Sequence, residues 1–242
     1  PVDVSLLFVF AMMSLTVFGT FFGGYASNNK YAFLGGLRAA SQMISYEIAL
    51  GATLIGVLLI YGTLDLAEAV RAQGTLLWGW LPMWGILLQP LGFLLFVTAG
   101  MAETKRVPFD LPEGESEIVG YFVEYSSMKF GAFFMTDFLE TILIASLIAT
   151  LFFGGWQVPY LEPDGLYLPW GPAIPLPEVL VVLLQFAALA AKVVFFCWFL
   201  LLIRWTLPRF RYDQLMRLGW KFMLPAAVVN ILVTALVLVL IE

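Results

Sequence analysis

The sequence has no histidine and a single cysteine, Cys197, and both shortages exclude kinds of chemistry. Protein-bound iron–sulfur clusters need several cysteine thiolates, and haem or zinc sites usually need histidine or several cysteines. We therefore expect this chain to bind no metal and no redox cofactor of its own, and no disulfide can form within it. Cys197 lies in an apolar run, which favours a packing role.

Charge is also scarce, because only 12% of the residues are Asp, Glu, Lys or Arg, while 62% are hydrophobic. Soluble domains carry about 25% charged residues. These values predict an all-α integral membrane protein, a polytopic helical bundle that forms a single membrane domain over residues 1–242. Nothing in this composition suggests nucleic-acid binding.

Six apolar segments are long enough to cross a bilayer, which takes about 20 residues. They predict six transmembrane helices, at about 4–24, 42–61, 82–102, 128–154, 179–203 and 222–241. The pair Gly35-Gly36 predicts a turn before the second of them. Because the sequence opens almost directly in a span, we expect either a processed N-terminus or a piece of a longer protein.

The basic residues predict the orientation. The connections 25–41, 103–127 and 204–221 hold almost all of the Lys and Arg residues, whereas the opposite side holds Arg71 and the fifth span holds Lys192. Basic residues gather on the cytoplasmic side of membrane proteins. We therefore expect these three loops on the cytoplasmic side, or on its organellar equivalent.

The second of these loops is dense in carboxylates. The stretch AETKRVPFDLPEGESEIVGYFVEYSSMKFG at 102–131 contains Glu103, Asp110, Glu113, Glu115, Glu117 and Glu124. A hydrated acidic turn is the simpler interpretation. However, Pro108, Pro112 and Gly114 impose turns, and apolar residues follow, so the segment is expected to re-enter a packed environment. Crowded, buried carboxylates titrate toward neutral pH, as a proton relay requires.

Four ionisable residues fall inside expected spans: Glu47, Asp137, Glu140 and Lys192. Charge at such depth is costly, so these side chains should face the bundle interior. Asp137 and Glu140 are three residues apart and share one helix face. Each residue alone could serve an interhelical ion pair. The four together, beside an acidic loop, favour a polar path through the bundle.

The other two loops add charge of the opposite sign. Lys30 and Arg38 lie in the first, while RFRYD at 209–213 in the third carries Arg211 and Asp213, which could pair and shape the loop. With the acidic loop, they should form one polar face that docks a soluble partner.

Three motifs carry a resemblance to a known family. They are SNNKYAFLGGLRAASQMISYE at 27–47, the acidic stretch at 102–131, and PRFRYDQLMRLGWK at 208–221. In this order they resemble the H subunit of bacterial NADH:quinone oxidoreductase, respiratory complex I, called NADH dehydrogenase subunit 1 in mitochondria. The resemblance covers essentially the whole chain. Members of that family begin with about two further spans, which this sequence is expected to lack.

The resemblance implies a membrane protein that helps form the quinone-binding chamber and couples quinone reduction to proton translocation. It implies proton-relay and coupling roles for Glu47, Glu103, Asp110, Glu113, Glu115, Glu117 and Glu124. It places Arg38, Arg204, Arg209, Arg211 and Asp213 in the quinone chamber or at a subunit interface. Quinone would be the substrate of the complex, while the FMN and iron–sulfur clusters would belong to other subunits.

The implied partners are the peripheral-arm subunits of the quinone site, the small membrane subunits that lead to the antiporter-like subunits, and lipid. The implied location is the bacterial plasma membrane or the mitochondrial inner membrane. Two alternatives stay open: the homologous membrane subunit of an energy-converting hydrogenase or formate-oxidising complex, and a free-standing ion transporter. Buried Glu47 and Lys192 argue against a passive membrane anchor.

Overall fold

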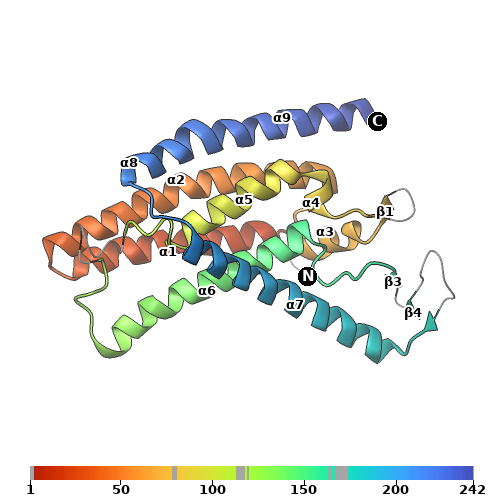
Figure 1. The fold of residues 1–242 in the computed structure, drawn as a ribbon, viewed down its shortest axis with the longest axis horizontal. Coiled ribbons are helices and arrows are strands. Elements are labelled where there is room, and N and C mark those ends of the chain that lie inside the picture. The colour runs from red at the N-terminus through yellow and green to blue at the C-terminus, as the bar shows by residue number, and fades with distance from the viewer. Residues whose placement is uncertain are drawn as a thin grey trace.

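A computed structural model describes residues 3–77, 81–112, 118, 120–162, 165–166 and 174–241. Long helices run side by side along its longest axis (Figure 1). They are α1 (Ser5–Ala26), α2 (Lys30–Tyr61), α6 (Ser127–Phe152), α7 (Glu178–Thr206) and α9 (Leu224–Ile241). The expected all-α polytopic class is confirmed, because five helical segments are long and apolar enough to cross a membrane.

Shorter elements mark the two ends of the bundle. At one end lie α3 (Leu66–Gln73), α4 (Gly85–Leu88) and the strands β1 (Leu76–Leu77), β2 (Leu81–Pro82), β3 (Leu161–Glu162), β4 (Gly165–Leu166) and β5 (Ile174–Pro175). The strands pair antiparallel, β1 with β2, and β4 with both β3 and β5. We call this the strand end. At the other lie the α1–α2 connection and α8 (Tyr212–Arg217), and we call it the α8 end.

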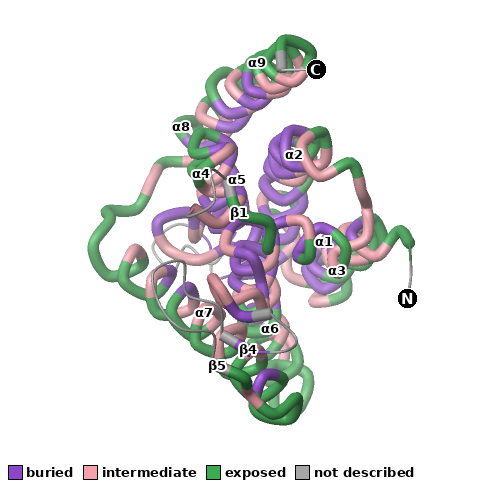
Figure 2. Tube along the Cα trace, turned by 90° about the vertical axis from the view of Figure 1, so that its right-hand side faces the viewer, coloured by how far each residue is buried: buried purple, intermediate pink, exposed green. Residues whose placement is uncertain are grey.

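Helix α2 organises the core. It packs against α1, against α5 (Pro90–Glu103) and against α9, while α7 packs mainly on α6. Buried residues concentrate along α2, α5 and α6 in the middle of the bundle (Figure 2). Most of the outer surface of α7 and α9 is exposed and apolar, as Val179, Phe186 and Leu240 illustrate. Such surfaces suit lipid or other membrane helices.

Helices α1 and α2 approach each other closely at the α8 end. A Cβ added at Gly24 would lie 2.8 Å from the carbonyl oxygen of Ala32 and 3.1 Å from the Cα atom of Gly36. Small residues let helix backbones meet in this way. The expected turn at Gly35-Gly36 is therefore wrong, because both glycines lie inside α2, and Gly36 serves this contact.

The expected span at 82–102 differs most from the observed structure. Its helix is broken, since α4 ends at Leu88, Gln89 is non-helical, and α5 starts at Pro90 and has only 14 residues. Proline suits the first turn of a helix and ends any helix that precedes it. This segment is therefore shorter than the other apolar helices.

The connections differ from expectation in two further places, the expected loops 25–41 and 204–221. The expected loop 25–41 is helical from Lys30 onward, so only residues 27–29 connect α1 to α2. Asn29 caps α2, because its side chain accepts a hydrogen bond from the Tyr31 amide at 2.9 Å. From α8, a π-helical segment η1 (Leu218–Met223) continues into α9 without a loop. The membrane boundaries and the orientation stay predictions.

Candidate functional site

A buried lysine forms the centre of the site. Lys105 follows the end of α5 with a positive φ of 54°, an uncommon conformation for a non-glycine residue. This turn directs its side chain into the bundle, where the residue is only 2% exposed. Its Nζ lies 3.2 Å from Oδ1 of Asp137 and 3.5 Å from Oε2 of Glu140, both on α6.

The surroundings keep Lys105 charged. Burial alone lowers the pKa of a lysine, because the charged form loses its hydration. The carboxylates of Glu140 and Asp137 outweigh this effect and raise the pKa of Lys105 above its ordinary value. The ammonium group therefore stays protonated at neutral pH and holds a permanent positive charge inside the bundle.

Glu103 is the least compensated member of the cluster. It ends α5, is 1% exposed, and neither of its carboxyl oxygens makes a hydrogen bond to any described residue. It lies within electrostatic range of Glu140, Glu47 and Lys105. Together, Glu103, Asp137 and Glu140 provide three carboxyl groups for one ammonium group. Because an uncompensated buried charge is costly, this arrangement favours a proton held on the carboxyl groups.

Helix α1 contacts Glu47 and forms a groove with α6 beside Glu140. Half-buried Glu47 of α2 accepts a hydrogen bond from the hydroxyl of Ser14 on α1. Glu140 lines a groove of about 370 Å³ between α1 and α6, together with Thr16 and apolar side chains such as Met12. The groove gives the cluster an opening between two helices.

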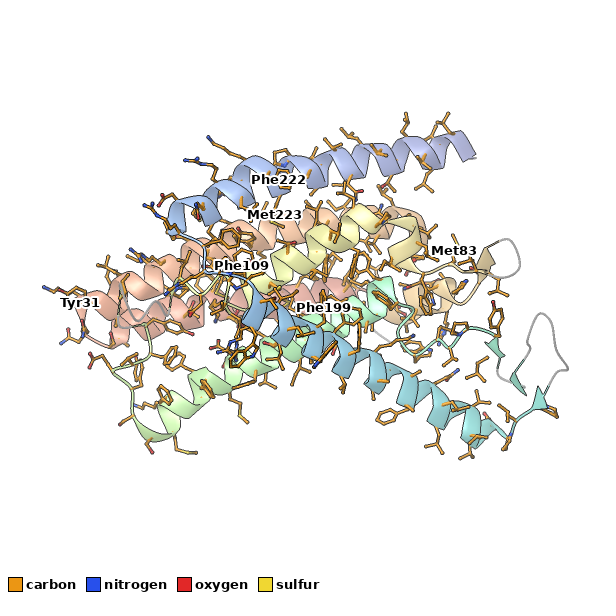
Figure 3. All side chains as sticks on the ribbon, viewed as in Figure 1. Tyr31, Met83, Phe109, Phe199, Phe222 and Met223 are labelled. Carbon is orange, nitrogen blue, oxygen red and sulfur yellow. The ribbon has the colours of Figure 1, made fainter. Side chains whose placement is uncertain are left out.

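The first half of the acidic loop is fixed by α2. The side-chain nitrogen of Gln42 donates hydrogen bonds to the carbonyl oxygens of Ala102, at 2.8 Å, and Phe109, at 2.9 Å. The Phe109 ring, near the middle of Figure 3, stacks on Phe210 at 5.4 Å and lies beside Tyr46. Gln42 and these aromatic rings thus attach the first half of the loop to α2 and to the segment before α8.

Residues from all three loops meet at the α8 end, as predicted. The side-chain amide nitrogen of Asn29 donates a hydrogen bond to the carboxylate of Glu124 at 2.6 Å, which joins the first loop to the end of the acidic loop. The guanidinium of Arg38 lies 5.7 Å from the ring centroid of Tyr212. Arg209 donates from its guanidinium to the carbonyl oxygen of Asp110.

The predicted pair of Arg211 and Asp213 is present, at 3.7 Å, but both side chains are largely exposed. Exposed ion pairs contribute little to stability. We therefore expect the pair to contribute little to holding the loop in place.

The structure divides the predicted site residues into groups. Glu47 and Glu103 join the buried cluster, whereas Asp110, Glu124, Arg38, Arg209, Arg211 and Asp213 lie in the surface network of the α8 end. Arg204 lies apart from both groups, on α7. Glu113, Glu115 and Glu117 lie outside the described residues.

Lys192 does not belong to the polar path that its sequence position suggested. Its Nζ donates to the carbonyl oxygens of Phe153, Gly155 and Gln157, at 2.7 to 2.8 Å, beyond the end of α6. A cation there satisfies carbonyl groups that have no partner within the helix. The lysine is therefore a helix cap near the strand end.

Sequence reasoning missed the role of Lys105, which it counted only as one of many loop bases. The sequence shows only that Lys105 follows Glu103 by two residues, because the inward turn of its side chain depends on the backbone conformation after α5. Gln42 and Tyr46 carried no signal either. Their roles depend on tertiary contacts with the acidic loop and with α8.

The fold and the cluster define a class of protein, a polytopic helical membrane protein with ionisable groups in its interior. Comparison with known proteins specifies it further. The family model described as NADH dehydrogenase matches residues 1–235, and the chain belongs to this family.

Three similar relatives illustrate the match. NADH-quinone oxidoreductase subunit 8 of Rhodothermus marinus is 46% identical over 237 residues, which cover 97% of this chain and 67% of the relative. An H subunit of the same enzyme from Cytophaga hutchinsonii is 42% identical over 96% of the chain and 64% of the relative. The H subunit of Salinibacter ruber is 45% identical over 98% and 68%. The chain thus spans about two thirds of their length.

Proposed function

We propose that this chain acts within NADH:quinone oxidoreductase as a membrane subunit that helps form the quinone chamber and transmits quinone reduction to proton translocation. Family membership supports the enzyme, since the relatives are named as its subunits. The observation that carries the coupling role is the buried cluster, in which three carboxyl groups share the positive charge of Lys105.

The cluster is suited to hold and release a proton. Carboxyl groups that cannot all ionise share protons as a coupled group. A nearby change of charge, such as the reduction of a quinone, would shift that sharing. Glu103 connects the two processes, because it lies in the cluster and is the residue at which α5 ends and the acidic loop begins.

The loop network at the α8 end supplies the proposed wall of the quinone chamber. Phe210 is half-buried and packs on the buried ring of Phe109, so it brings aromatic surface to this end, and arginines such as Arg38 and Arg209 bring positive charge beside it. A quinone ring needs apolar contacts along its body and polar groups at its oxygens. The peripheral-arm subunits would cover this face, which lies on the cytoplasmic side in the predicted orientation.

The groove between α1 and α6 gives the proposed exit for the proton. Glu140 and Thr16 line it beside apolar residues, a surface that suits a neighbouring membrane helix. We assign this face to the small membrane subunits that lead toward the antiporter-like subunits. The chain itself would hold no redox group, and the FMN and iron–sulfur clusters would lie elsewhere in the complex.

The test is the substitution Glu47→Gln in the assembled complex. Glutamine keeps the size and the hydrogen bond to Ser14 but cannot titrate, so assembly should persist while quinone reduction and proton pumping fall together. Glu47→Asp, which keeps the charge, should be milder. Glu68→Gln is the matched control, because Glu68 is on α3 at the strand end and bonds to Thr63. Full turnover and full pumping in Glu47→Gln would refute the coupling role.

A further inference from the structure

A slot opens between α6 and α7, and none of the described residues that line it comes from α2. It has a volume of about 130 Å³ and its walls include Phe138 and Ile142 of α6 and Cys197 and Leu201 of α7. Residues from the end of α5 close its floor. The residues assigned to the proton path lie elsewhere. The slot has an apolar body and a charged mouth.

Two arginines form the mouth. Arg204 is in the last turn of α7 and is exposed, while Arg106 lies just beyond α5 and is half-buried. The guanidinium of Arg106 lies 4.4 Å from the ring centroid of Phe138, and its buried Nη2 makes no hydrogen bond to any described residue. Because no carboxylate among the described residues lines the slot, the two positive charges have no counter-charge in its walls.

The slot continues from this mouth toward the membrane interior. Cys197 is seven residues before Arg204 on α7, which places it about 10 Å further along the helix axis at 1.5 Å per residue. Trp205, next to Arg204, is 83% exposed. An exposed indole is typical of the level where lipid headgroups meet the hydrocarbon region. The arginines therefore mark headgroup depth, and the apolar part lies at acyl-chain depth.

We propose that this slot binds an anionic phospholipid, with the phosphate between Arg106 and Arg204 and one acyl chain along Leu201 and Cys197. Arginine guanidinium groups bind phosphate with paired hydrogen bonds. Basic pockets between membrane helices bind anionic headgroups. The occupant must carry an apolar chain and a headgroup phosphate with net negative charge, because the apolar body is continuous with a mouth that holds two positive charges. Such a lipid would stabilise the contact between α7 and α6.

Cys197 gives a direct readout, because it is the single cysteine of the chain and lines the slot. The delipidated, assembled complex is treated with N-ethylmaleimide, and modification of Cys197 is measured on its peptide by mass spectrometry. Phosphatidylglycerol should slow the modification, whereas phosphatidylcholine and inorganic phosphate should not. The amount of phosphatidylglycerol that stays bound after purification gives a second, independent measurement.

Variants locate the headgroup. Arg204→Gln and Arg106→Gln should each raise the phosphatidylglycerol concentration needed for protection about tenfold, equivalent to about 1.4 kcal/mol. Arg204→Lys should recover much of the protection because it keeps the charge. Arg217→Gln is the charge-matched control, since Arg217 lies on α8 and does not line the slot.

Three outcomes would overturn the proposal. Equal protection by phosphatidylcholine, which carries the phosphate but no net charge, would show that the slot does not select an anionic headgroup. Protection by inorganic phosphate alone would show a simple anion site. A Cys197 that stays unreactive in the delipidated complex would show that the slot is closed to ligands.

Discussion

The strand end of the bundle and the cluster around Lys105 differ in how fully their buried polar groups are hydrogen-bonded. Toward the strand end, the side chain of Gln73 donates to the carbonyls of Ala69 and Thr150 and accepts from the amides of Gly85 and Gly154. A second group there, the ammonium of Lys192, makes three hydrogen bonds to carbonyl groups beyond the end of α6. Both groups are well satisfied, and their contacts hold helix ends in place.

The cluster around Lys105 is charged and incompletely satisfied. The carboxyl group of Glu103 has no hydrogen bond among the described residues, and the carboxyl groups outnumber the ammonium group. A buried carboxyl group whose charge is not compensated favours its protonated form, and a change of nearby charge can release that proton. The comparison separates groups that maintain the fold from groups that can carry the proposed function.

The largest effect is expected where the charge balance is removed. Lys105→Met deletes the ammonium group beside Asp137 and Glu140 and leaves both carboxyl groups without it. Removing one partner of a buried ion pair costs about 3–5 kcal/mol. We expect a strong loss of assembled protein, measured by its content in purified membranes and by the thermal stability of the complex.

The double variant Lys105→Met with Asp137→Asn sharpens this test. It removes one positive and one negative charge together, so it should recover a large part of the assembly. Wild-type assembly in the single variant would show that the ion pair does not support the fold.

A smaller effect is expected at the helix cap. Lys192→Met keeps the length of the side chain but removes its hydrogen bonds to Phe153, Gly155 and Gln157. Hydrogen bonds to charged groups contribute about 1.5–3 kcal/mol each, and water and rearrangement should replace part of this loss. We expect a lower melting temperature with unchanged proton pumping per quinone reduced. A change in pumping would contradict the assignment of Lys192 as a helix cap.

The smallest effect is expected at a neutral cluster between α5 and α9. Gln89 accepts a hydrogen bond from Asn230 at 2.9 Å and donates to Thr234 at 2.6 Å. Hydrogen bonds between membrane helices average about 0.6 kcal/mol. Gln89→Met, of similar length, should therefore lower the melting temperature slightly without changing pumping. Loss of pumping at wild-type stability would extend the functional region into this neutral cluster.

Sequence patterns predicted the helical class, because apolar runs and scarce charge constrain a membrane protein strongly. They also indicated Glu47, Asp137 and Glu140 as interior groups. They could not reveal that Lys105 turns inward, because that depends on a backbone conformation after α5. Nor could they separate Lys192 from the acids, since depth along a helix says nothing about which neighbouring carbonyl groups it meets. The break before α5 could have been predicted from Pro90, its first residue. The prediction of one unbroken span followed the apolar composition instead.

The central claim is that the buried cluster holds a proton that quinone reduction can shift. Difference infrared spectroscopy of the reduced and oxidised complex observes carboxyl protonation directly, and Glu103→Gln removes one candidate group without adding charge. We predict a carboxyl band that changes on reduction and is lost or shifted in Glu103→Gln, while Glu68→Gln leaves the spectrum unchanged. A reduction spectrum identical in the wild type and Glu103→Gln would contradict the claim.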